Sequence, residues 1–203
     1  MKKGIFKIAL IAFFVMGFCT FASSQTLISG YYGNGLSLAY NPASKQISGY
    51  FENYTGLDNN GEPVFSCIFY FKEALTGSKI HITTFYPADS AGSLVKGTLE
   101  IVNETNVKIL LDENPGGCWN VQDFDKTPIS FSLEKKMPWL YISYITASKV
   151  YLKNATNASA NKNVYLRKGD LVFVSRVKNN YAYCTYYGKK KMSGLIKLDA
   201  LNR

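Results

Sequence analysis

The chain has 203 residues and a formal net charge of +9, with 23 Lys or Arg residues against 14 Asp or Glu residues. Its one apolar run of note, residues 8–18, is too short to span a bilayer comfortably, so we expect no transmembrane segment in the mature chain. The chain contains a single histidine, which argues against Cys-His or zinc-dependent hydrolysis.

The first 24 residues have the pattern of a signal peptide. Three lysines accompany the start of the apolar run, and residues 22–24 (Ala-Ser-Ser) provide the small side chains that a signal peptidase requires. The sequence therefore predicts cleavage after Ser24 and a soluble exported protein, which in a bacterium is periplasmic or secreted. Loss of the three lysines lowers the formal charge to +6.

Residues 25–140 are predicted to form an acidic β domain. Short segments of alternating polarity, separated by Asn-Pro, Asp-Asn-Asn-Gly and Asn-Pro-Gly-Gly turns, indicate strands rather than helices. Their even spacing predicts an all-β domain, either an antiparallel barrel or a sandwich. The expected strands are 27–32, 36–40, 46–53, 64–71, 79–86, 96–102, 106–111 and 128–133.

Charge is divided unevenly along the chain. Residues 25–145 carry eight Lys or Arg against twelve Asp or Glu, a net charge of −4, whereas residues 146–203 carry twelve against two, a net charge of +10. Such an asymmetry is typical of two modules that face different partners. The alternative is that the basic segment only keeps a small domain soluble.

Three cysteines remain after processing. Cys67 and Cys118 both lie in the acidic half, and an oxidising compartment favours a bridge between them. That disulfide closes a loop of about 50 residues, which contributes on the order of 4 kcal/mol in the chain-entropy description. Cys184 is expected to stay free and to pack as a small apolar residue.

The C-terminal segment, residues 146–203, is predicted to form a small basic β-barrel. A Lys168-Gly169-Asp170 turn precedes a strand with two valines at 172 and 174, and a second strand contains Tyr181, Cys184 and Tyr186. Gly194-Leu195 opens the last strand. This order resembles the bacterial SH3-like (SH3b) domain, although Tyr181 and Leu195 occupy positions where the family usually has Trp. The resemblance implies a barrel that binds peptidoglycan or protein.

Tyrosines and lysines gather in this basic segment. Aromatic rings beside cations are typical of surfaces that stack on a polyanion, and export argues against nucleic acid as that partner. The alternative is that half of the tyrosines face the barrel core. The predicted binding residues are Tyr181, Tyr183, Tyr187, Lys189, Lys190 and Lys191.

The sequence offers weak candidates for catalysis. His81 alternates with apolar neighbours and has no partner in the sequence pattern, so we expect it to lie half exposed on a strand. The carboxylate pairs Asp112-Glu113 and Asp123/Asp125 resemble the paired acids of glycosidases, and the second pair is also compatible with calcium, but a solvated acidic loop is the simpler interpretation. We therefore predict no catalytic residue, metal or cofactor.

Two functions remain as hypotheses. The first is an exported, non-enzymatic binding protein of the bacterial cell envelope, whose SH3-like module docks to a cell-wall polymer or an envelope protein. The second is a periplasmic inhibitor or immunity protein against a peptidoglycan-degrading enzyme, because an acidic barrel complements a basic hydrolase. An exported β-barrel with one disulfide is similar in outline to periplasmic lysozyme inhibitors.

Overall fold

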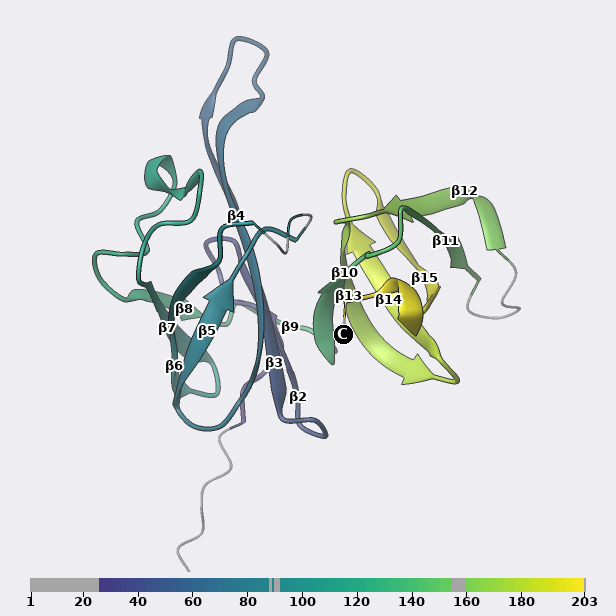
Figure 1. The fold of residues 1–203 in the computed structure, drawn as a ribbon, viewed down its shortest axis with the longest axis horizontal. Helices are drawn as coiled ribbons and strands as arrows, with labels where there is room; N and C mark the ends of the chain where they lie inside the picture. The colour runs from purple at the N-terminus through teal and green to yellow at the C-terminus, as the bar shows by residue number, and fades with distance from the viewer. Residues whose placement is uncertain (1–25, 88, 90–91, 155–159, 203) are drawn as a thin grey trace, which may run out of the picture.

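A computed structural model describes residues 26–87, 89, 92–154 and 160–202 (Figure 1). Within these residues the chain forms fifteen strands and two short 3-10 helices, and every strand pairing is antiparallel, which confirms the all-β class. The predicted signal peptide, residues 1–24, lies outside the described residues. In the part that the structure describes, no helix is long and apolar enough to cross a membrane.

The N-terminal half contains two open sheets. The first has the order β4-β3-β2-β1-β9, and the second has the order β5-β6-β7-β8. Their bounds are β1 Gly30–Tyr31, β2 Leu36–Asn41, β3 Gln46–Leu57, β4 Pro63–Ala74, β9 Lys135–Lys136, β5 Lys79–Thr84, β6 Val95–Asn103, β7 Asn106–Leu111 and β8 Ile129–Ser132. Five of the eight predicted strands agree with these bounds to within two residues at each end. The strands predicted at 46–53 and 64–71 are observed as β3 and β4, which are three or four residues longer at their C-terminal ends. Of the first predicted strand, 27–32, only Gly30–Tyr31 is a strand.

Both sheets contribute side chains to one core. In β3, Ile47 and Phe51 are buried, and in β6, Leu99 and Ile101 are buried between exposed or half-buried neighbours. This alternation follows from the two-residue period of a strand, which places one side of each sheet against the core. No sheet closes on itself within the described residues, so the predicted barrel is wrong for this half, and two open sheets over a shared core fit the sandwich alternative.

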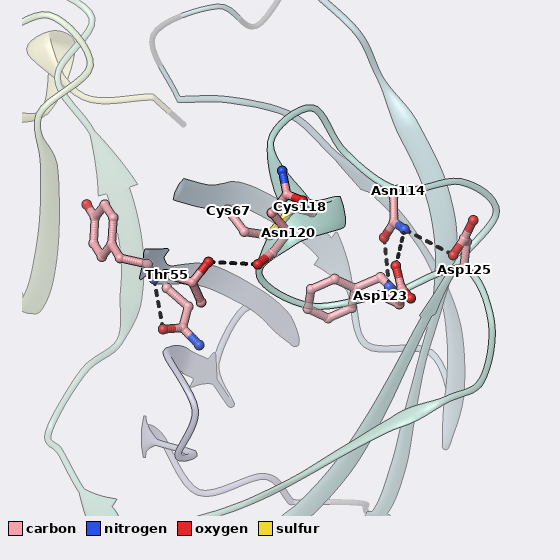
Figure 2. The surroundings of a disulfide bond; sticks show 10 residues. Thr55, Cys67, Asn114, Cys118, Asn120, Asp123 and Asp125 are labelled. Carbon is pink, nitrogen blue, oxygen red and sulfur yellow. Dashed lines mark hydrogen bonds between the residues drawn. A yellow bond between two sulfur atoms is a disulfide. The ribbon is translucent and has the colours of Figure 1, made fainter. Parts of the chain in front are cut away.

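A disulfide joins the long loop after β7 to the first sheet. Cys67 lies in β4, and Cys118 begins the short helix η1, Cys118–Asn120 (Figure 2). Next to it, the Thr55 hydroxyl donates to the Asn120 carbonyl oxygen at 2.7 Å. The predicted Cys67–Cys118 bridge is therefore confirmed, and Cys184 is free and buried.

The C-terminal half is one strongly curved sheet of six strands with its own core (Figure 1). The order is β10-β13-β14-β15-β11-β12, so β10 and β12 are its ends and the predicted closed barrel is not formed. A short helix, η2 Leu198–Ala200, follows the last strand. The bounds are β10 Tyr141–Tyr144, β11 Lys149–Lys153, β12 Ala160–Arg167, β13 Leu171–Lys178, β14 Tyr181–Tyr187 and β15 Lys191–Lys197.

Two turns in this sheet need unusual backbone angles. Asn179 and Asn180 both have positive φ, 48° and 63°, which is the geometry of a two-residue hairpin turn that follows the strand twist. Gly169 has φ of 89°, where a Cβ is strained. Val172 and Val174 follow this turn and are buried in the C-terminal core.

A third cluster of buried residues lies between the two halves. We call it the junction core; its buried members are Ala39, Tyr70, Trp139, Ile142, Tyr144 and Phe173. Here the Tyr70 hydroxyl donates to the Ile142 carbonyl oxygen at 3.1 Å, and the Ile142 amide donates to Ser48 Oγ at 2.7 Å. Strand β10 therefore belongs to the C-terminal sheet and packs on the N-terminal one, although it precedes residue 146, the predicted start of the second domain.

Candidate binding surfaces

The six predicted binding residues lie along one hairpin, but they do not form one cluster. Tyr181 and Tyr187 are the two ends of β14, which places them about 20 Å apart along the strand. Lys191 pairs with Tyr187 in β15, and Lys189 and Lys190 are exposed in the connecting turn. The three lysines therefore lie beside Tyr187 and far from Tyr181.

Tyr187 packs at the edge of the junction core. Its ring centroid lies 5.1 Å from that of Phe173, 6.2 Å from that of Tyr31 and 6.3 Å from that of Trp139. The Lys191 ammonium lies 5.6 Å from the same ring centroid. This tyrosine thus lies between the junction and the lysine turn, and Tyr183, four residues earlier, is on another part of the sheet.

Strands β11 and β12 carry a ladder of tyrosines and cations on their outer side. Lys149 Nζ lies 4.9 Å from the ring centroid of Tyr151 and 4.1 Å from that of Tyr165. Arg167 Nη2 donates to the Tyr165 hydroxyl at 3.1 Å. The four residues are direct neighbours because Lys149 pairs with Arg167, and Tyr151 pairs with Tyr165, across the two strands.

The ladder continues toward β13 and β14. Lys153 Nζ donates to the Tyr181 hydroxyl at 3.0 Å. The Arg176 guanidinium lies 5.7 Å from the ring centroid of Tyr183, its cross-strand partner. We call the whole band the tyrosine–cation face; its members are Lys149, Tyr151, Lys153, Tyr165, Arg167, Arg176, Tyr181 and Tyr183.

This face is electropositive. Within the described residues, the one ion pair shorter than 4 Å joins Lys126 to Asp125, in the N-terminal half, at 3.7 Å. The hydrogen bond from the Arg167 guanidinium lowers the pKa of Tyr165, and the hydrogen bond from the Lys153 ammonium lowers the pKa of Tyr181. Both shifts follow from nearby positive charge, which favours the phenolate.

Six of the eight residues of this face were not among the predicted binding residues. The predicted site includes Tyr181 and Tyr183 but omits the ladder of Lys149, Tyr151 and Tyr165. The pattern Lys149-x-Tyr151-x-Lys153 alternates along a strand, and that period places all three side chains on the same side. This alternation could have predicted that Lys149, Tyr151 and Lys153 share one side of a strand. The pairing of β11 with β12, which brings Tyr165 beside them, depends on the tertiary fold.

A cleft of about 560 Å³ opens between the two halves of the molecule. One wall comes from β3, where Tyr50, Glu52 and Tyr54 alternate on the side of the sheet that faces away from the N-terminal core. The opposite wall comes from the turn at Gly169–Asp170 and from the end of β14. The aromatic residues that line the cleft are Tyr31, Tyr50, Tyr54, Tyr86, Phe173, Tyr186 and Tyr187.

The charged groups that line the cleft are all acidic. They are Glu52, Glu134 and Asp170, and the lining includes no Lys, Arg or His. The Tyr54 hydroxyl donates to Glu52, and Tyr50 is also hydrogen-bonded to it. Burial raises the pKa of Tyr50, Tyr54 and Tyr186, and the Glu52 carboxylate raises each of them further. The cleft is therefore electronegative, and the neutral form is favoured at Tyr50, Tyr54 and Tyr186.

The other candidate residues lie apart from both surfaces. Asn114 donates to Asp123 Oδ1 at 3.0 Å and to Asp125 Oδ1 at 3.1 Å, and its own carbonyl oxygen accepts from the Phe124 amide at 2.7 Å (Figure 2). Those two carboxylates thus organise the loop next to the disulfide. His81 is exposed on β5. Across the described residues, no three His, Cys, Asp or Glu side chains are grouped to hold a metal ion.

Comparison of the chain with protein-family models, with curated proteins and with solved structures found no match.

Proposed function

We propose that the protein is an exported, non-enzymatic binding protein of the bacterial cell envelope, and that its SH3-like C-terminal half docks to an anionic cell-wall polymer. The observation that carries this proposal is the tyrosine–cation face, where four tyrosines and four cations line the outer side of one sheet. An envelope protein with an acidic surface is the other partner that such a face can bind.

The chemistry of the face fits a long polyanion. Cations held against tyrosine rings are pre-positioned, which reduces the conformational entropy lost when they bind a phosphate or carboxylate group. The rings add apolar surface for the sugar or backbone between the charges. A net charge of +10 over residues 146–203 attracts such a polymer before contact. The lysine turn, Lys189–Lys191, lies at the other end of β14, beside Tyr187, and adds positive charge to the same half.

Binding to defined polymers tests this proposal. We expect the exported chain to bind polyphosphate or polygalacturonate and not neutral dextran. Affinity should fall steeply with added salt, because the Debye length is only about 8 Å at physiological ionic strength. Replacing Lys149 and Arg167 together by Gln should weaken binding about tenfold, from the loss of two cationic contacts.

A matched control separates the effect of the tyrosine–cation face from the effect of net charge. Replacing Lys79 and Lys96, two exposed lysines of the N-terminal half, by Gln changes the net charge by the same amount and should leave affinity unchanged. The triple change of Lys189, Lys190 and Lys191 to Gln tests the predicted turn in the same assay and is expected to weaken binding without unfolding the sheet. Equal affinities for all three variants, or binding that does not respond to salt, would contradict the proposal.

Inhibition of a wall hydrolase is the second candidate function, and the β3–β4 hairpin favours it. This hairpin projects from the N-terminal half (Figure 1), and its tip is ordered by Asp58. The Asp58 carboxylate accepts from the amides of Asn60 at 2.8 Å and Glu62 at 2.9 Å. These bonds lower the pKa of Asp58 and hold a rigid acidic loop beside the exposed side chain of Leu57. Such a loop can enter the cleft of a basic enzyme.

The inhibitor hypothesis has its own test. The protein is expected to slow the hydrolysis of peptidoglycan by a basic lysozyme-type enzyme, and Asp58→Ala should weaken inhibition because the tip loses its organising carboxylate. Glu113→Gln, an exposed acid outside the hairpin, is the control and should inhibit as the unaltered protein does. If saturating protein has no effect on hydrolysis, this candidate is removed and the docking proposal is untouched.

A further inference from the structure

The cleft between the two halves has the size and position of a ligand site. Its volume, about 560 Å³, falls within the range of roughly 300–1,000 Å³ that is usual for small-molecule sites, and such sites favour the boundary between two packed units. The junction core closes its floor, since Phe173 belongs to that cluster and also lines the cleft. Hydrogen bonds at Ile142 hold the two walls in place.

The lining combines neutral aromatic rings with carboxylates. Tyr31, Phe173 and Tyr187 form one ring cluster, with centroid separations of 5.1 to 6.5 Å. Tyr50 and Tyr54 flank Glu52 on the β3 wall. The face of an aromatic ring attracts a cation, and a carboxylate adds charge and accepts hydrogen bonds from N–H groups.

The net charge of the cleft lining is negative, whereas the net charge of the chain is positive. The lining carries three carboxylates, Glu52, Glu134 and Asp170, and no cationic side chain, in a protein whose formal charge is +9. An anionic ligand is therefore disfavoured in the cleft, although the tyrosine–cation face of the same molecule attracts one. The two surfaces select ligands of opposite charge.

The protein itself places an ammonium group next to one ring of this site. Lys191 is exposed and is not part of the lining, but its Nζ lies 5.6 Å from the ring centroid of Tyr187, which lines the cleft. This contact is an example, within the chain, of an alkylammonium ion beside a ring that belongs to the cleft lining. Lys191 also adds positive charge next to the cleft, so it opposes a second cation there.

We propose that the cleft binds an alkylammonium group, with tyrosine rings around the charge and with Glu52 and Glu134 as its counter-charges. The ammonium can belong to a small molecule or to a lysine side chain of a partner, because the chemistry of recognition is the same. The site is separate from the tyrosine–cation face and does not depend on the function proposed for that face.

Calorimetry with the exported chain tests this proposal. Choline is the quaternary probe, and 3,3-dimethylbutan-1-ol is its neutral isostere. Cadaverine and Nα-acetyl-lysine amide are primary-ammonium probes for the small-molecule and the lysine source. We expect saturable binding of at least one cation and about tenfold weaker binding of the neutral isostere, because the isostere lacks the charge that rings and carboxylates attract.

Variants locate the binding within the cleft. Glu52→Gln and Glu134→Gln should each weaken cation binding several-fold, and Glu134 is exposed, so its change should not affect folding. Tyr54→Leu should weaken binding, whereas Tyr54→Phe should retain most of it because the ring remains. Glu113→Gln is the control outside the cleft and should bind as the unaltered protein does.

A change of Lys191 is expected to affect cation binding in the opposite direction from the changes of Glu52 and Glu134. Lys191→Gln should strengthen cation binding in the cleft, since it removes a competing ammonium, although the same change should weaken docking of an anionic polymer. The proposal is overturned if no cation binds saturably, if choline binds and the neutral isostere binds equally well, or if Glu134→Gln and Glu113→Gln have equal effects.

Discussion

Tyr50 and Tyr165 carry the same phenol group on two surfaces of opposite charge. Burial raises the pKa of Tyr50, and the neighbouring Glu52 carboxylate raises it further. Tyr165 is exposed, and the Arg167 guanidinium that donates to its hydroxyl lowers the pKa below the ordinary value of 10.0. Negative neighbours disfavour the phenolate and positive neighbours favour it. The direction of the pKa shift of each tyrosine therefore follows the sign of the neighbouring charge.

An alkaline titration followed by the absorbance of the phenolate should separate the two classes. Tyr165 and Tyr181 should ionise first, since the pKa of each is lowered below 10.0 by a hydrogen bond from a cation. The double change of both residues to Phe should remove this early phase, and Tyr50→Phe should leave it in place. An early phase of unchanged amplitude in the double variant would show that the cations do not contact these rings in solution.

The buried tyrosines also predict how stability depends on pH. Burial raises the pKa of Tyr32, Tyr50 and Tyr70 in the folded state above the ordinary value of 10.0, so the folded chain holds these protons more tightly than the unfolded chain. Their stabilising contribution is complete below that value and is lost as pH rises above it. Urea unfolding should show a falling free energy of unfolding above pH 10.0, and a flat profile there would contradict the assignment.

Strand β3 illustrates how one element serves several parts of the molecule. Ile47 and Phe51 face the N-terminal core, Ser48 accepts a hydrogen bond from the C-terminal half, and Glu52 lines the cleft. Near its end, Thr55 is hydrogen-bonded to the loop that carries Cys118. The period of two residues allows this division, because successive side chains alternate between the core and the junction.

Thiol labelling tests which cysteines are bridged and which one is free. Burial raises the pKa of the Cys184 thiol to about 12 and removes it from solvent, so the native chain without residues 1–24 should not react with a thiol reagent near neutral pH. Unfolding without reductant should expose one thiol, and unfolding with reductant should expose three, because Cys67 and Cys118 are bridged. Three reactive thiols without reductant would exclude the disulfide.

At the scale of the whole molecule, the two halves have separate sheets and separate cores but share the junction core. Strand β10, Tyr141–Tyr144, pairs with β13 of the C-terminal sheet and contacts the N-terminal sheet through Ile142. The division into a 25–140 domain and a 146–203 domain remains a prediction, and β10 falls between the two ranges.

Two fragments test whether the C-terminal half folds by itself. Residues 141–203 should give a β spectrum and unfold cooperatively, with marginal stability because so small a sheet buries little surface. Residues 146–203 lack β10 and leave the edge of β13 unpaired, so their denaturation midpoint should be lower. If both fragments give random-coil spectra while the whole protein is folded, the two-domain division is wrong.

The sequence by itself determined the features that depend on local pattern. Alternation and turn residues predicted most of the strands of the N-terminal half, and the placement of Cys67 and Cys118 in the same acidic half predicted the bridge between them. The charge division between the two halves is also a property of the sequence alone. It predicted where positive charge gathers, although not which tyrosines lie beside it.

Only the tertiary structure decided which residues meet across long separations. Tyr50 and Glu52 of β3 face Asp170 and Tyr186 across the cleft, more than a hundred residues away in the chain. No short-range pattern encodes this approach, because it depends on how β10 packs one sheet against the other. For the same reason the sequence left barrel and sandwich as alternatives for the N-terminal half, and the closed barrel predicted for the C-terminal half is not formed. Alternation shows which side of a strand is buried, whereas closure of a sheet depends on which strands become its edges.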